Sequence, residues 1–170
     1  MKLKHQLQCN DILLVVSALT KTGRSYSRQI FCSFEEKIIA DAPLLSISDL
    51  SQLVHLYVES ADSINVSFIK AMLLSVKLSD IKKGQFRDWK HLLSVIQKSG
   101  VTDRELLKQC CEALAGKVED ISVYDAMELL NCLLALNVNH HGLIAAITQR
   151  VNTMPGDVSA VRNLLLKFTR

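Results

Sequence analysis

An aspartate recurs along this chain at nearly constant intervals, and apolar residues keep the same positions behind it each time. The four aspartates are Asp11, Asp49, Asp88 and Asp125, separated by 38, 39 and 37 residues. Apolar residues follow at positions +1, +4, +5 and +8, counted from the aspartate, which is the spacing of one face of an α-helix. A long period with a fixed internal pattern predicts a stack of repeated supersecondary units.

Each repeat is predicted to be a helical hairpin, whose first helix we call the A helix and whose second helix we call the B helix. Three of the four residues at position +12 are of the types that best tolerate the left-handed conformation after a helix end, and position +19 stays apolar, so the B helix keeps the register of the A helix. The residues at position +12 are Gly23, Ala61, Gly100 and Asn137, and those at position +19 are Ile30, Phe68, Leu107 and Ile144. No stretch alternates apolar and polar residues for long enough to predict a strand.

The predicted fold is therefore all-α, a single domain over residues 1–170, arranged as an α-solenoid of about four and a half repeats. The repeats are expected near 11–48, 49–87, 88–124 and 125–156, with a half-repeat at 157–170. We expect A helices near 11–22, 49–60, 88–99 and 122–136, and B helices near 25–40, 63–76, 102–115 and 139–152. The four aspartates are interpreted as helix N-caps and not as a catalytic array. In the second repeat, Ser48 is an alternative cap.

Composition predicts a chain that is buried against other subunits. Apolar residues make up 49% of the sequence and the mean hydropathy is +0.20, while charged residues stand at 22%. The longest aliphatic run, Ile12–Val16, is too short to cross a bilayer, so no membrane insertion is expected. A net charge of +3 does not by itself predict a nucleic-acid partner. Five cysteines without a C-x-x-C spacing favour a reducing compartment, with the thiols as small core residues.

Two segments carry a resemblance to known repeat families. The segments ISDLSQLVHLYVES at 47–60 and SVYDAMELLNCLLALNVN at 122–139 resemble the octotricopeptide and heptatricopeptide repeats and the repeats of FAST-kinase-like proteins. The resemblance covers about 11–152, but the RAP domain common in those families is absent. It implies an RNA-contacting subunit of a mitochondrial ribonucleoprotein, in the matrix, together with other protein subunits. The N-terminal residues MKLKHQLQCN have no clear presequence, which leaves the cytoplasm as the alternative location.

The first candidate RNA site is the basic segment KLSDIKKGQFRDWKH at 77–91. Its cations could contact phosphates, and Phe86 or Trp89 could stack on an unpaired base. The alternative is a solvated loop, with Trp89 in the core because it occupies the apolar +1 position. The residues assigned to this site are Lys77, Lys82, Lys83, Arg87, Lys90 and His91.

The second candidate RNA site is a polar side of the A helices, at positions +3 and +6. In modular helical-repeat proteins, two or three side chains at fixed helix positions read one base per repeat. The alternative is a plain outer helix face. Position +6 holds Ser17, His55, Ser94 and Asn131, and position +3 holds Gln52, His91 and Glu128, with Leu14 as the exception. Of these, Gln52, His55, His91, Ser94 and Asn131 are assigned to RNA binding.

The sequence gives no pattern for catalysis, a cofactor or a metal. It contains no G-x-S-x-G, P-loop, G-x-G-x-x-G or H-E-x-x-H motif, so no enzyme and no small-molecule substrate are predicted. His140 and His141 are adjacent and would point about 100° apart on a helix, which disfavours a shared metal. The second functional hypothesis is a purely protein-binding scaffold without an RNA role.

Overall fold

The computed structural model describes residues 8–20, 24–60, 64–76, 83–101 and 103–169, and every regular element in these ranges is a helix. The first hairpin comprises α1 (Cys9–Thr20) and α2 (Arg24–Asp41), and the short 3₁₀ helix η2 (Ala42–Leu44) follows it. The later elements are α3 (Ile47–Ser60), α4 (Val66–Leu73), α5 (Phe86–Ser99), α6 (Arg104–Ala115), α7 (Val123–Ala135), α8 (His141–Thr153), α9 (Ser159–Leu165) and the 3₁₀ helix η4 (Leu166–Phe168).

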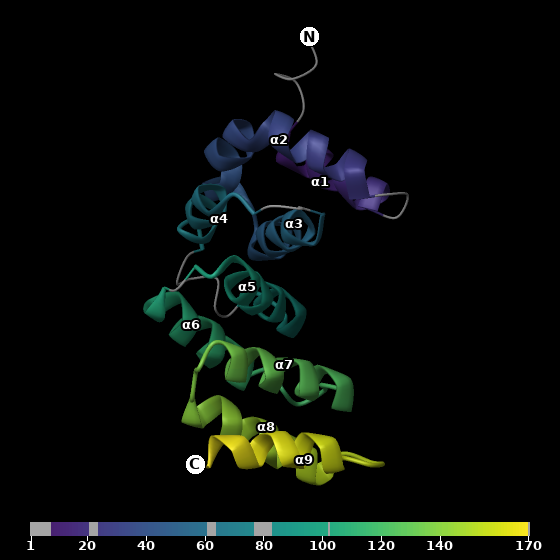
Figure 1. Ribbon diagram of the computed structural model, residues 1–170, viewed down its shortest axis with the longest axis vertical. Coiled ribbons are helices and arrows are strands. Elements are labelled where there is room, and N and C mark those ends of the chain that lie inside the picture. The colour runs from purple at the N-terminus through teal and green to yellow at the C-terminus, as the bar shows by residue number, and fades with distance from the viewer. Residues whose placement is uncertain (1–7, 21–23, 61–63, 77–82, 102, 170) are drawn as a thin grey trace.

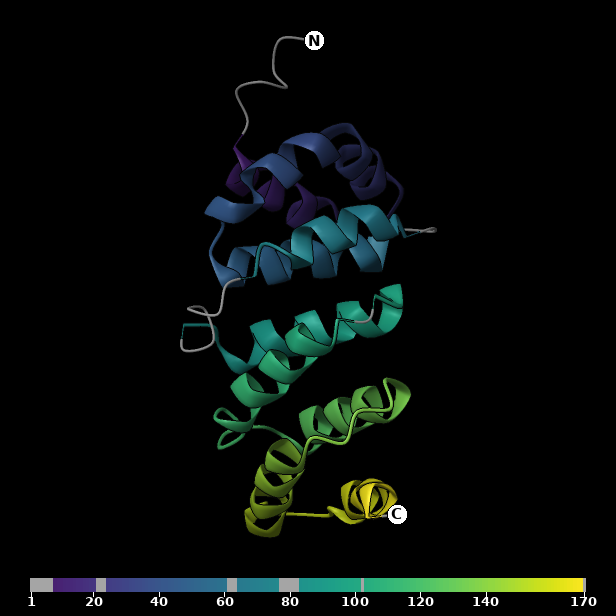
Figure 2. The same cartoon turned by 90° about the vertical axis from the view of Figure 1, so that its left-hand side faces the viewer.

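The helices stack along the long axis of the molecule in two rows, with the chain termini at opposite ends (Figure 1, Figure 2). The predicted A helices α1, α3, α5 and α7 pack successively on one another, and α9 continues this row by packing on α7. The B helices α2, α4, α6 and α8 lie on the other side, where α2 packs on α4 and α6 on α8. Within the described residues, none of these helices is long and apolar enough to span a membrane.

The predicted apolar positions form the core that joins the two rows. At position +4, Leu53 and Leu92 are fully buried and Leu129 is 1% exposed. The largest buried side chain, Trp89, is likewise fully buried, as its +1 position indicates. Of the apolar residues predicted for the first B helix, Phe31 and Ile38 are buried; burying such side chains contributes about 1.5–3 kcal/mol each.

The repeating aspartates are not N-caps, so this prediction is wrong: each aspartate lies three residues after the N-cap position. Each is the third residue of its A helix and accepts a hydrogen bond from the residue three positions earlier, as in a capping box. The main-chain amide donates to the carboxylate in three repeats, and the Ser46 hydroxyl does so in the second, where Ser46 also accepts from the amide of Asp49 at 3.1 Å. The contacts are Gln8 N to Asp11 Oδ2 at 2.9 Å, Ser46 Oγ to Asp49 Oδ2 at 2.6 Å, Gln85 N to Asp88 Oδ2 at 2.8 Å, and Ser122 N to Asp125 Oδ2 at 3.3 Å.

Replacing Asp49 by alanine should destabilise the protein by about 1 kcal/mol, because the first turn of α3 loses its reciprocal hydrogen bonds and a favourable charge. Urea denaturation followed by circular dichroism measures this. Asp120→Ala is the control, because Asp120 is exposed in the link before α7, and we expect a change below about 0.5 kcal/mol there. Equal effects of the two substitutions would contradict the capping role.

The second B helix is shorter than predicted. It begins at Val66 instead of residue 63, because the Asn65 side chain accepts from the amides of Ser67 at 3.1 Å and Phe68 at 3.2 Å and so fixes the helix start. It ends at Leu73, three residues before the predicted end at 76. The link from α4 to α5 is therefore longer than the sequence pattern indicates.

Candidate functional site

The polar +3 and +6 residues lie on the side of the A helices and meet across neighbouring helices. Gln52 Nε2 of α3 donates to Ser17 Oγ of α1 at 3.4 Å. His91 of α5 stacks on His55 of α3. In both places, position +3 of one A helix lies against position +6 of the preceding one. Neighbouring A helices therefore use equivalent contacts, and the polar residues are partly engaged with each other.

The two histidines form a nearly parallel stack. Their ring centroids are 4.0 Å apart and the ring planes are inclined by 4°. The Nδ1 atoms of both rings are buried without a hydrogen-bond partner. A buried N–H donor without a partner is rarer in proteins than a buried acceptor without one. We therefore assign the proton of each neutral ring to Nε2, which leaves Nδ1 as an acceptor.

Burial depresses the basicity of both rings. The pKa of His91 is lowered to about 3, mainly by burial, with the neighbouring His55, Arg87 and Lys90 acting in the same direction. Burial also lowers the pKa of His55, with Lys98 acting in the same direction and Glu59 opposing. Both imidazoles are therefore neutral near pH 7.

A metal ion does not fit between these rings. The lone pair of an imidazole nitrogen lies in the plane of its ring, so two parallel rings direct their lone pairs along parallel lines that do not converge. Within the described ranges, no group of three or more histidine, cysteine, aspartate or glutamate side chains is placed to hold a metal. His140 has a different role: its Nδ1 accepts from the amide of Leu143 at 3.1 Å, as the N-cap of α8.

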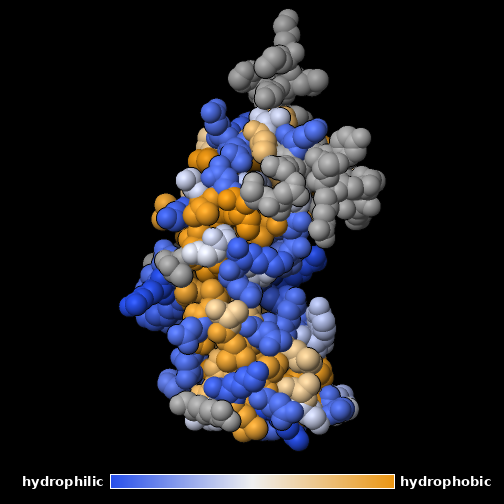
Figure 3. Space-filling model, viewed as in Figure 1, coloured by the Kyte–Doolittle hydropathy of each residue, from blue (hydrophilic) through white to orange (hydrophobic). Residues whose placement is uncertain are grey.

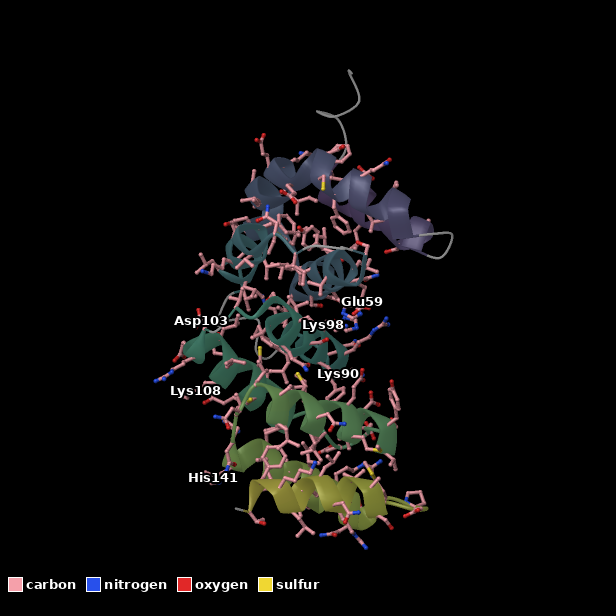
Figure 4. The ribbon with its side chains drawn as sticks, viewed as in Figure 1. Glu59, Lys90, Lys98, Asp103, Lys108 and His141 are labelled. Carbon is pink, nitrogen blue, oxygen red and sulfur yellow. The ribbon has the colours of Figure 1, made fainter. Side chains whose placement is uncertain are left out.

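Ion pairs join α5 to the A helix on each side of it. Lys90 Nζ lies 2.7 Å from Asp125 Oδ1 and 2.9 Å from Glu128 Oε2 of α7, and Lys98 pairs with Glu59 of α3. Figure 4 shows Lys98 and Glu59 close together, on the same side of the stack as Lys90. Burial lowers the pKa of Lys90, but its hydrogen bonds to the two carboxylates outweigh burial, so the pKa is raised. Lys90 is thus a charged structural link, which disfavours its predicted contact with a phosphate.

The charges around the histidine stack are balanced. Arg87, Lys90 and Lys98 are opposed by the carboxylates of Glu59, Asp125 and Glu128. A balanced set of charges produces little net attraction for a polyanion. This surface therefore lacks the excess of positive charge that sequence-independent RNA binding requires.

A small hollow lies beside the histidine stack, between α5 and α7. Its volume is about 220 Å³, below the roughly 300–1,000 Å³ of typical small-molecule sites. It has room for one side chain or one base. Among the predicted RNA-binding residues, Ser94, His55, His91 and Lys90 line it, together with Glu128, Leu129 and Cys132. Asn131 is exposed on α7 and does not line this hollow.

The basic segment contributes only part of its predicted site. Lys83 and Arg87 are exposed, whereas Lys77 and Lys82 lie outside the described residues. Trp89 is fully buried and Phe86 is half-buried against the core, so the prediction that Trp89 could stack on a base is wrong. The core position that the repeat pattern gives to Trp89 is confirmed.

Of the four cysteines whose side chains the structure describes, three are core residues and one is not. Burial raises the pKa of Cys111 to about 11 and that of Cys132 to about 12, and it raises the pKa of Cys110 further still. Thiols with such pKa values are poor nucleophiles. Cys32 is exposed on α2, which departs from the predicted core role.

Comparison of the chain with protein-family models, curated proteins and solved structures finds no match. The resemblance to organellar helical-repeat families therefore gains no support from these comparisons.

Proposed function

We propose that the chain is a non-catalytic α-solenoid scaffold that binds protein segments along its stack. The equivalent contacts between successive A helices support the solenoid arrangement, because each helix presents the same side to its neighbour. The observation that carries the binding role is the exposed apolar surface. Figure 3 shows a band of apolar atoms running down the face seen in Figure 1, from the level of α3 and α4 to the lower helices.

A separate observation is an exposed apolar side chain beside a hollow. Leu74, at the C-terminal end of α4, is 80% exposed and lines a hollow of about 170 Å³ with Leu73 and Val101. Lys70 and Asp103 flank the same hollow. Contiguous exposed apolar surface with a polar rim is typical of protein-binding sites. An apolar side chain of a partner would fit the chemistry of this hollow.

Photocrosslinking in the native complexes tests this proposal. A photoreactive phenylalanine derivative is placed at position 74 in one variant and at position 87 in another, and the adducts are treated with nuclease or protease. We expect protease-sensitive adducts from position 74 that nuclease does not alter. Nuclease-sensitive adducts from position 87, with none from position 74, would contradict the scaffold role.

The second candidate is an RNA-contacting subunit of a mitochondrial ribonucleoprotein. The observation in its favour is that Lys83 and Arg87 are exposed and have no ion-pair partner among the described side chains. The mitochondrial matrix belongs to this candidate alone, because it comes only from the family resemblance.

Replacing Lys82, Lys83 and Arg87 together by glutamine tests this second candidate. If these cations contact phosphates, affinity for a single-stranded RNA should fall, and the slope of log affinity against log salt should decrease by about 0.7 per lost contact. A filter-binding or anisotropy titration at several salt concentrations measures both quantities. Lys108→Gln is the control, because Lys108 lies on α6, outside the basic segment, and pairs with Glu112 of the same helix at 3.9 Å. Unchanged affinity and slope in the triple variant would exclude the basic segment as an RNA site.

A further inference from the structure

The first A helix, α1, is apolar on its solvent side as well as on its buried side. Leu14 is 70% exposed and Val15 is 42% exposed, and Ala18 is exposed on the same side. The opposite side buries Ile12 and Val16. A helix that is apolar all round is normally covered on all sides, so the open side of α1 is suited to contact with another element.

Position +4 is covered in α3, α5 and α7, and position +7 is buried in α5 and α7 and half-buried in α3. Position +4, which Val15 occupies in α1, is at most 1% exposed in α3, α5 and α7. At position +7, where Ala18 lies, Val95 of α5 is fully buried and Cys132 of α7 is 9% exposed. The residues at positions +4 and +7 of these three helices are Leu53, Leu92, Leu129, Leu56, Val95 and Cys132.

Contacts between helices identify what covers these positions. Cys132 Sγ, at position +7 of α7, contacts the carbonyl oxygen of Leu93 in α5 at 3.6 Å. Lys90, at position +2 of α5, pairs with Asp125, at position 0 of α7. The side that carries positions 0, +3, +4 and +7 therefore faces the preceding A helix. In α1 this is the open side, and it carries the exposed Asp11 beside Leu14 and Val15.

The far end of the row does not complement this surface. Positions +2, +5 and +6 are the ones that face the next A helix, and in α9, counted from Asp157, they are Ser159, Arg162 and Asn163, all exposed. Position +5 is apolar in α1, α3, α5 and α7. A second copy stacked head to tail would place the polar Arg162, in place of an apolar +5 residue, against Val15 and Ala18, which is an unfavourable contact for these apolar side chains.

We propose that the open side of α1 is a docking surface for an amphipathic helix of a partner protein, seated where a preceding A helix would lie. The partner helix presents its +5 position to Val15 and Ala18, since the +5 residue Leu93 lies against Cys132 through its carbonyl oxygen, and an aliphatic residue suits this position because it is apolar in α1, α3, α5 and α7. It presents a lysine or serine to Asp11, as Lys90 is presented to Asp125. This surface is distinct from the hollow at Leu74, and the proposal does not depend on whether the basic segment contacts RNA.

A helical peptide with the sequence of α5, residues 86–99, serves as the probe, because α5 already packs in this way on α7. A hydrocarbon staple replaces His91 and Val95, which lie on the side turned away from the expected contact, and circular dichroism establishes that the peptide is helical. Fluorescence anisotropy measures its binding to the full chain. We expect saturable binding that Leu14→Glu weakens by about ten-fold or more. The unmodified chain should bind the peptide that carries Leu93→Glu at least as weakly as the Leu14→Glu variant binds the original peptide.

Leu166→Glu is the matched control, because Leu166 is 63% exposed at the other end of the row. This variant should bind the peptide within about two-fold of the unmodified chain. Equal weakening by the two variants, equal binding of the two peptides, or no binding of a helical peptide at about 1 mM would overturn the proposal. Sedimentation that reveals a dimer of the chain alone, lost in Leu14→Glu, would overturn it in favour of a second copy. The photocrosslinking at position 74 is read out separately, so failure of one proposal is distinguishable from failure of the other.

Discussion

Replacing Trp89 by alanine should lower the free energy of unfolding by about 3–5 kcal/mol, the usual cost of truncating a large buried aromatic residue. The indole is fully buried, and the chain passes directly beside it at Gly84. A methyl group added to Gly84 would lie 2.6 Å from the indole Nε1 and 3.2 Å from Ile47 Cγ2. The cavity left by alanine would be closed only in part, because the residues around it belong to helices that other contacts hold in place.

Chemical denaturation with fluorescence and circular dichroism as probes measures this loss. Trp89→Phe is the informative companion, because the buried indole Nε1 has no hydrogen-bond partner among the described residues and phenylalanine removes that unsatisfied donor. We expect Trp89→Phe to cost clearly less than Trp89→Ala. Tyr124→Ala, at a residue that is 70% exposed, should change stability by less than about 0.5 kcal/mol. A small effect of Trp89→Ala would contradict the core position of this residue.

Acidification should destabilise the protein, with a steep contribution from His91. Its pKa in the folded chain is about 3, whereas an imidazole in an unfolded chain titrates near the ordinary value of about 6.5. Between these two pH values the unfolded chain binds a proton that the folded chain does not. This contribution to stability is therefore complete above about pH 6.5 and is lost as the pH falls toward 3, by about 1.4 kcal/mol per pH unit.

Several charged groups face this histidine, and they set the direction of the effect. Arg87 and Lys90 of α5 oppose its protonation together with His55 of α3, while Glu59 of α3 favours it. In His91→Leu, the number of protons that the chain takes up on unfolding should fall by about one. Denaturation midpoints from pH 7 to pH 4 measure this number. His141→Leu is the control, because His141 is exposed on α8, away from Lys90 and Lys98 (Figure 4). An identical pH dependence in the His91 variant and the unmodified chain would refute the depressed pKa.

Helix type and order could be predicted from the sequence because each A helix carries the same apolar positions. Position +4 is buried in α3, α5 and α7, at Leu53, Leu92 and Leu129, but the prediction is wrong for Val15, at the same position of α1, which is 42% exposed. Helix ends were predicted less well, since Asp49 and its counterparts act at the third helical position, and a single aspartate does not reveal which of the two roles it has. The cap formed by Asn65 was missed for a related reason: the apolar pattern of that B helix extends past its true start.

The sequence indicates residues of the candidate site, but it does not indicate which of them contact one another. Positions +3 and +6 were correctly singled out as polar, but a pattern along one helix does not reveal that His91 would lie on His55 of another helix. The ion pairs of Lys90 could have been predicted from the sequence. Lys90 lies at position +2, and the next repeat carries acids at positions 0 and +3, Asp125 and Glu128. Comparing positions between successive repeats, instead of within each repeat, would have indicated this neutralisation.

The main packing contacts join helices that are at most two places apart in the chain order. Contacts of short sequence separation cost little loop-closure entropy, so such a chain belongs among the faster folders of its size. The same arrangement has a consequence for damage. Because α1 and α9 share no contact, a substitution that loosens one end can open that end while the other keeps its structure. Destabilising substitutions in this protein would therefore act locally, and each would disrupt the binding surfaces only in its own part of the stack.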